Sequence, residues 1–177
     1  MRDFNSIFRD RIKPDDFMAI IEIPKGSNQK YEIDPLSGML KLDRILYTST
    51  HYPANYGFIP HTYAEDGDPL DVLVFCSEGL YPMSTVQCYP IGGMLMLDEN
   101  VHDEKILAVP FNDPQMAGYK DLSDLPHHLF DEIQHFFTVY KELENKETAI
   151  VQSFDAAKAK EVIQACFDAY ERLNSGI

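Results

Sequence analysis

Short apolar runs recur along the first two thirds of the chain, and turn residues rather than helical segments separate them. Several of these runs alternate apolar and polar residues, which is typical of half-buried strands. We predict strands at residues 17–24, 28–34, 39–46, 72–76, 84–96 and 105–110. Residues 52–58 and 98–103 are predicted loops, and Gly92-Gly93 predicts a bulge in the long strand. Five or more short strands within residues 17–110 predict a small closed or nearly closed antiparallel barrel.

The hydrophobic period changes after Pro110 to steps of three and four residues, which predicts amphipathic helices. The first helix has these apolar positions: Leu129, Phe130, Ile133, Phe136, Phe137, Tyr140 and Leu143. Asp124 is its expected cap and Pro126 suits its first turn. A second helix is expected over residues 155–173, with Gly176 beyond its end. The predicted fold is therefore α+β and mainly β, with a five-stranded barrel flanked by two main helices.

Length and composition fit one domain over residues 1–177, with a peripheral arm at 1–16, a barrel at 17–110 and a helical part at 111–177. The formal net charge of −14 disfavours nucleic acids and anionic membranes as partners unless a local basic patch exists. No stretch approaches the roughly 20 apolar residues of a membrane span, and charges interrupt every early apolar run. Three cysteines without a C-x-x-C spacing indicate free thiols. These features predict a cytoplasmic protein.

One turn carries three carboxylates within six residues: Asp66, Asp68 and Asp71, in the segment D-G-D-P-L-D. Gly67 permits a backbone shape closed to other residues, and Pro69 fixes its own φ. Asp, Gly and Pro are also the ordinary residues of a solvated turn. Like charges this close resist ionisation unless a cation holds them, so the segment alone leaves a plain turn and a divalent-cation site equally open.

A second acidic segment supports the cation site. Asp98 and Asp103 bracket a polar stretch that Glu104 and Lys105 follow directly. If the two segments meet at one end of the barrel, they supply enough carboxylates for two or more Mg²⁺ ions. An EF-hand is excluded because the sixth and twelfth residues of the loop that starts at Asp66 are not Gly and Glu.

Basic and phenolic residues in the same part of the chain point to an anionic ligand that arrives with metal, and phosphate fits. They are Lys30, Arg44, Lys105, Lys141, Tyr52, Tyr56 and Tyr140. Structural alternatives remain open for several of them. Arg44 could pair with Asp43 or Asp68, the tyrosines could be packing residues, and Glu22 could be a solvated strand charge. The histidines match no zinc spacing.

The ordered motifs resemble family I soluble inorganic pyrophosphatases of the bacterial type. They are I-E-I-P, K-Y-E-I-D, D-R, Y-P-A-N-Y-G-F, D-G-D-P-L-D-V, D-E-N-V-H-D-E-K and H-F-F-T-V-Y-K, in that order between about residues 17 and 145. The resemblance implies an OB-like barrel and Mg²⁺-dependent hydrolysis of pyrophosphate to two phosphates by metal-bound water or hydroxide. Many bacterial members have tryptophans after the segment matching Lys141, and this chain has none.

The resemblance also implies roles for single residues. Asp68 would be the catalytic base. The metal ligands would be Asp66, Asp71, Asp98 and Asp103. The phosphate-binding residues would be Lys30, Arg44, Tyr56, Tyr140 and Lys141, with support from Glu22, Glu32, Tyr52 and Lys105. By analogy with bacterial members, the chain would form a homohexamer.

Two other classes of function are compatible with parts of the pattern. A non-catalytic OB module could stack single-stranded nucleic acid on Tyr52, Tyr56 and Phe58, although the negative charge opposes it. A metal-dependent nucleotide hydrolase is the second alternative, although the sequence has no P-loop.

Overall fold

The computed structural model describes residues 11–175. Residues 1–10 of the predicted arm and the helix-terminating Gly176 lie outside this range. The described part of the arm includes β1 (Ile12–Lys13), which pairs with the start of β2 (Asp16–Ile23).

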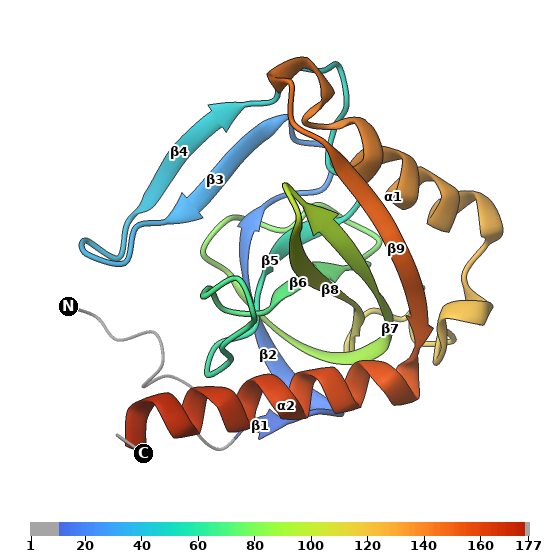
Figure 1. The fold of residues 1–177 in the computed structure, drawn as a ribbon. Coiled ribbons are helices and arrows are strands. Elements are labelled where there is room, and N and C mark those ends of the chain that lie inside the picture. The colour runs from blue at the N-terminus through green and yellow to red at the C-terminus, as the bar shows by residue number, and fades with distance from the viewer. Residues whose placement is uncertain (1–10, 176–177) are drawn as a thin grey trace.

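Five strands close into a ring, which confirms the predicted five-stranded barrel (Figure 1). In ring order they are β2, β5 (Asn55–Phe58), β6 (Asp71–Val74), β8 (Val101–Pro110) and β7 (Thr85–Asp98), and β7 pairs back with β2. The prediction of an all-antiparallel barrel is wrong, because β6 and β8 run parallel. An odd number of strands cannot alternate direction around a closed ring, so one pair must be parallel.

The strands β3 (Gln29–Ile33) and β4 (Leu40–Ile45) form a separate two-stranded sheet that projects from the ring (Figure 1). The prediction counted both as barrel strands; β5 takes that place, although residues 52–58 were predicted as a loop. Gly57 explains how β5 packs so closely, because a Cβ there would lie 1.8 Å from the backbone oxygen of Ile20 on β2.

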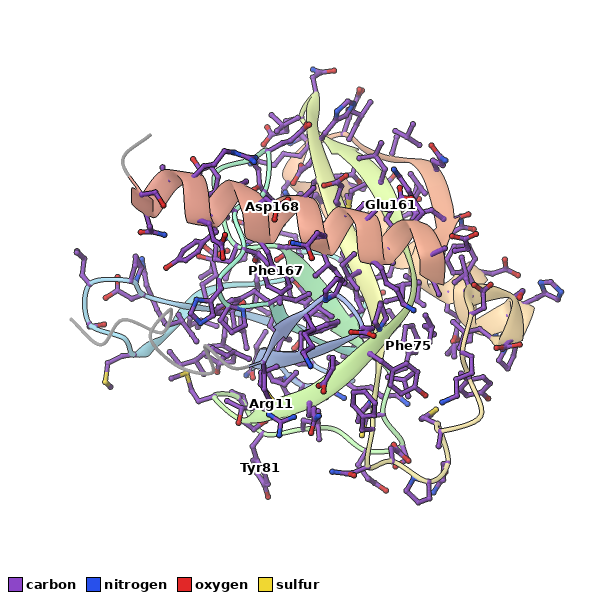
Figure 2. The ribbon with its side chains drawn as sticks, turned by 90° about the horizontal axis from the view of Figure 1, so that it is seen from below. Arg11, Phe75, Tyr81, Glu161, Phe167 and Asp168 are labelled. Atoms are coloured by element: carbon purple, nitrogen blue, oxygen red, sulfur yellow. The ribbon has the colours of Figure 1, made fainter. Side chains whose placement is uncertain are left out.

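Both faces of the ring strands are buried, which explains their continuous apolar runs. On β8, Leu107 and Val109 lie in the core that includes α1 (His127–Val139), whereas Ile106 and Ala108 lie in the core that includes α2 (Ala156–Ser175). Figure 2 views the molecule from the α2 side, with Phe167 turned toward the strands and Asp168 on the outer side of the helix.

The turn between β7 and β8 and the strand β9 also differ from the prediction. The expected loop at residues 98–103 is a tight turn, because β8 begins at Val101, and both turn residues, Glu99 and Asn100, have positive φ. β9 (Thr148–Asp155) was not predicted and pairs along β7 as an edge strand. The bulge expected at Gly92-Gly93 is present as a register shift between Pro90 and Gly92.

The first helix begins and ends differently from the prediction. Asp124 does not cap α1; it ends the short 3₁₀ helix η2 (Leu122–Asp124), where it forms a capping box with Asp121. The helix ends at Val139, and Leu143 is exposed in a second 3₁₀ turn, η3 (Glu142–Glu144). Within residues 11–175, neither helix combines the length and apolar character that a membrane crossing requires.

Candidate active site

A buried ammonium group organises the centre of the site. Lys105 Nζ lies 2.7 Å from Asp71 Oδ2 and 2.9 Å from each carboxylate oxygen of Asp103, and it donates to the Tyr56 hydroxyl at 3.1 Å. The Tyr56 hydroxyl also donates to Asp71. Only 2% of the Lys105 side chain is exposed, so all of this charge is compensated within the protein.

Strand register brings these four residues together. Asp71 on β6 pairs directly with Lys105 on β8. Asp103 lies two residues before Lys105 on the same strand, and side chains two apart share a face. Tyr56 comes from β5, the other neighbour of β6.

The ammonium and its two carboxylates shift one another's pKa values. Burial opposes the charged form of Lys105, but Asp71 and Asp103 more than offset it and raise the pKa of Lys105. Burial is the main cause that raises the pKa of Asp103, an effect that Lys105 opposes and Asp71 reinforces. Because one ammonium contacts two carboxylates, the cation does not fully compensate them.

Aromatic rings from the end of α1 pack against this cluster. The Lys105 ammonium lies 5.4 Å from the ring centroid of Phe137, and Phe137 lies 5.5 Å from Tyr140. Tyr52 contacts both Tyr56 and Phe136, at centroid distances of 5.3 and 4.8 Å. Tyr52 and Tyr140 are thus core residues, as the structural alternative allowed, and they line the buried side of the cluster.

The acidic turn leads into the cluster from outside the ring. Gly67 has a φ of +91°, which confirms the left-handed backbone expected of it, and the Asp66 carboxylate accepts a hydrogen bond from the Asp68 amide at 3.1 Å. Burial, followed by the charge of Asp71, raises the pKa of Asp68. Burial and then Asp71 and Asp68 raise that of Asp66. Neither side chain touches Lys105, but both experience the charge of the cluster.

Lys30 and Arg44 lie directly opposite each other on β3 and β4. The register shifts at this pair, which leaves Asp43 as an extra residue in β4. Strict alternation would put Arg44 on the same face as Leu42, but this bulge turns Arg44 to the opposite face. Like charges in opposed positions repel, and carboxylates compensate them: Lys30 pairs with Glu32, and Arg44 pairs with Asp43 and Glu144.

Lys141 and Asp98 form a third charged contact. Asp98 ends β7, and Lys141 directly precedes η3. The Lys141 ammonium donates to Asp98 Oδ2. The other carboxylate oxygen, Oδ1, is buried and has no hydrogen-bond partner among residues 11–175.

Glu22 lies between the barrel cluster and the β3–β4 sheet. It is the extra residue where the β2–β5 register shifts, and its carboxylate accepts the Ile33 amide at 2.8 Å. Burial raises the pKa of Glu22 to about 8; the Ile33 hydrogen bond opposes this, and Asp71 and Glu32 add to it.

The donor set fits divalent cations with a preference for oxygen. Among residues 11–175, no three carboxylate, imidazole or thiol groups already converge as a metal site. However, Asp66 and Asp103 have raised pKa values beside Asp71, and Asp98 has a buried oxygen without a partner. Added positive charge would relieve both conditions.

The family model described as inorganic pyrophosphatase matches residues 19–171. This chain belongs to the inorganic pyrophosphatase family. The inorganic pyrophosphatase of Halalkalibacterium halodurans is 45% identical over 160 residues, which cover 90% of this chain and 98% of that protein. The crystal structure of inorganic pyrophosphatase from Thermus thermophilus has a TM-score of 0.87 and 41% identity, and covers 89% of this chain and 92% of that one.

A more distant relative in the inorganic pyrophosphatase family has been solved with a ligand. The N-terminally truncated vacuolar soluble pyrophosphatase of Trypanosoma cruzi, in complex with PPi, has a TM-score of 0.82 and 26% identity. It covers 91% of this chain and 71% of that one.

In this member of the inorganic pyrophosphatase family, the residues predicted for the site form separate groups and not one continuous contact network. Lys105 joins Asp71, Asp103 and Tyr56, and Lys141 joins Asp98. Asp66 and Asp68 share the acidic turn, and Lys30 and Arg44 lie on the projecting sheet. Sequence reasoning missed Glu144, the Arg44 partner. No local signal distinguishes Glu144 from Glu142 and Glu147, because the pairing spans 100 residues.

Proposed function

We propose that this chain hydrolyses inorganic pyrophosphate to two phosphates in the presence of Mg²⁺. The observation that carries the proposal is the buried cluster of Lys105, Asp71, Asp103 and Tyr56 in a chain of the inorganic pyrophosphatase family. Asp66, Asp71, Asp98 and Asp103 would hold several Mg²⁺ ions. When bound, these ions would neutralise phosphate oxygens and acidify water.

Individual side chains are assigned to proton transfer and to stabilisation of the leaving group. Asp68 takes the proton of the attacking water as the general base. The water oxygen forms the new bond to one phosphorus atom as the bridging P–O bond breaks, so no phosphoenzyme is required. The bridging electrons pass to the departing phosphate, whose negative charge Arg44 and Lys141 stabilise.

The other predicted residues position the substrate and the ligands. Lys30 binds a phosphate oxygen beside Arg44, and Tyr56 and Tyr140 complete the substrate-binding residues from the barrel side. Lys105 holds Asp71 and Asp103 in place. Glu22, Glu32 and Tyr52 support the neighbouring side chains. By family analogy we further propose a cytoplasmic homohexamer, which light scattering coupled to gel filtration would test.

Phosphate release tests the activity directly. Pyrophosphate and nucleoside triphosphates are each supplied with Mg²⁺ and then with excess chelator. The expected result is phosphate release from pyrophosphate only, which the chelator abolishes. Equal release from triphosphates would favour a nucleotide hydrolase instead, and no release at all would contradict the proposal.

Replacing the proposed base tests the mechanism. Asp68→Asn should lower kcat by at least about 100-fold, within the range expected for a lost general base, while the unfolding midpoint stays near that of the parent because Asp68 is exposed. Asp131→Asn, on the exposed side of α1, is the matched control and should keep the parent rate. A near-normal kcat for Asp68→Asn would refute the role of Asp68.

A further inference from the structure

The two segments that carry the proposed phosphate-binding cations are joined by an ion pair. Arg44 on β4 donates from Nε to Glu144 Oε1 at 2.9 Å. The end of the β3–β4 sheet that bears this contact lies beside the turn between α1 and β9 (Figure 1). This contact links the projecting sheet, which carries Lys30, to the turn that begins at Lys141.

The pair is partly shielded from water. Side-chain exposure is 23% for Arg44 and 11% for Glu144, so solvent screens their attraction less than that of a surface pair. Burial disfavours the charged form of Arg44, but Glu144 and Asp43 more than offset it and raise the pKa of Arg44.

Only part of the guanidinium group is used by these carboxylates. Glu144 accepts from Nε and Asp43 accepts from Nη1. Within the described part of the chain, no acceptor lies at hydrogen-bond distance from Nη2. Because the guanidinium fork is planar and rigid, a carboxylate at Nε fixes the direction in which the free N–H groups point.

Glu144 is itself held by its own turn. Its amide donates to the Lys141 carbonyl at 2.9 Å, and the following residue, Asn145, closes the turn with a φ of +57°. The position of Glu144 is therefore tied to that of Lys141, whose ammonium group pairs with Asp98.

We propose that Glu144 is a positioning residue that aligns Arg44 with Lys141 so that both can bind the same pyrophosphate. The inference rests on the proposed function. Glu144 touches neither substrate nor metal in this role; it acts through Arg44. Without it, Arg44 keeps its charge but loses its fixed direction, so substrate binding weakens while the chemical step is largely retained.

If Glu144 instead competed with phosphate for Arg44, its removal would change KM in the opposite direction. If the Glu144 carboxylate merely occupied Arg44 until a phosphate displaced it, removing the carboxylate would strengthen substrate binding. The sign of the change in KM therefore separates alignment from competition.

The test compares Glu144→Ala, Glu144→Gln and the control Glu142→Ala. Glu142 lies in the same turn, but it lines a cavity of about 700 Å³ that Glu144 does not line. Arg44 pairs with Glu144 and not with Glu142. Glu142→Ala therefore removes one negative charge, as Glu144→Ala does, but leaves the partner of Arg44 in place. KM and kcat for pyrophosphate with Mg²⁺, and the unfolding midpoint, are measured for each variant. Binding of inorganic phosphate is measured by calorimetry.

Glu144→Ala should raise KM, and the dissociation constant of phosphate, by about tenfold, or about 1.4 kcal/mol, with kcat within about twofold. Glu144→Gln should recover most of this loss because its amide oxygen still accepts from Nε, and Glu142→Ala should match the parent. An unchanged or lowered KM in Glu144→Ala, or a glutamine variant as impaired as the alanine variant, would overturn the inference alone. A parent that releases no phosphate from pyrophosphate would overturn the proposed function and this inference with it.

Discussion

The barrel cluster and the β3–β4 sheet hold their charges in opposite ways. In the barrel the Lys105 ammonium is buried, and several hydrogen bonds and the strand register fix it between two partly buried carboxylates. Lys30 and Arg44 instead lie on a two-stranded sheet outside the ring, where both cations and their carboxylate partners remain partly exposed. We infer that the charges around Lys105 contribute to folding, whereas those of Lys30 and Arg44 remain available to bind a ligand.

The largest expected effect is in the barrel. Lys105→Met leaves the partly buried carboxylates of Asp71 and Asp103 without their buried cation, so the free energy of unfolding should fall by about 3–5 kcal/mol. Unfolding by guanidinium chloride in the presence of a chelator measures this change in the free energy of unfolding. The control is Lys158→Met, whose exposed pair with Glu161 contributes little, so this variant should unfold like the parent. An equal free energy of unfolding for Lys105→Met and Lys158→Met would contradict the claim that the buried ammonium stabilises the fold more than the exposed one does.

Glu22 lies between the two regions, and its raised pKa makes the stability of the fold depend on pH. Its folded pKa of about 8 exceeds the ordinary 4.5, so between these pH values the unfolded chain releases a proton that the folded chain retains. Stability therefore falls as pH rises through this window.

Glu22→Gln removes this cost and can still accept the Ile33 amide. In chelator it should be more stable than the parent by about 1–3 kcal/mol at pH 8.5, with the difference vanishing near pH 4.5. Glu171→Gln, at an exposed position on α2, should show no such trend. A stability gain that does not vary with pH would contradict the assignment.

The smallest effect on stability is expected in the projecting sheet. Lys30→Gln should change the free energy of unfolding by less than about 1 kcal/mol, yet raise KM for pyrophosphate about tenfold or more. Lys41→Gln on β4, which is exposed, is the control and should change neither quantity. A loss of stability as large as that of Lys105→Met would show that the two regions do not differ.

Local patterns predicted most of the elements but not the order of the ring. A continuous apolar run located β2, alternation located β3, and the three- and four-residue period located α2. β5 was missed because Pro53, Asn55 and Gly57 are poor strand formers, whereas its pairing with both β2 and β6 overrides propensity. β9 was missed because an edge strand with one mostly exposed face has a weak apolar signal.

The candidate site was predictable as a set of residues but not as a set of contacts. The carboxylates of the acidic turn are close in sequence, and Asp103 and Lys105 share a strand face by their spacing. The contact of Lys105 with Asp71 depends on a parallel pairing that neither segment encodes alone. The contact of Arg44 with Glu144 depends on where the projecting sheet ends, and the bulge at Asp43 changed even the face on which Arg44 lies.

The parallel pair of β6 and β8 has a consequence for biosynthesis. Domains fold as units while the chain emerges from its N-terminus, so the aspartate at 71 leaves the ribosome before the lysine at 105, its ammonium partner. Until β8 is synthesised this carboxylate lacks that partner, and the ring cannot close because its fifth strand is missing. The last ring strand to be made, β8, thus carries the ammonium group that pairs with Asp71. Closure of the barrel and partial compensation of this carboxylate therefore occur together.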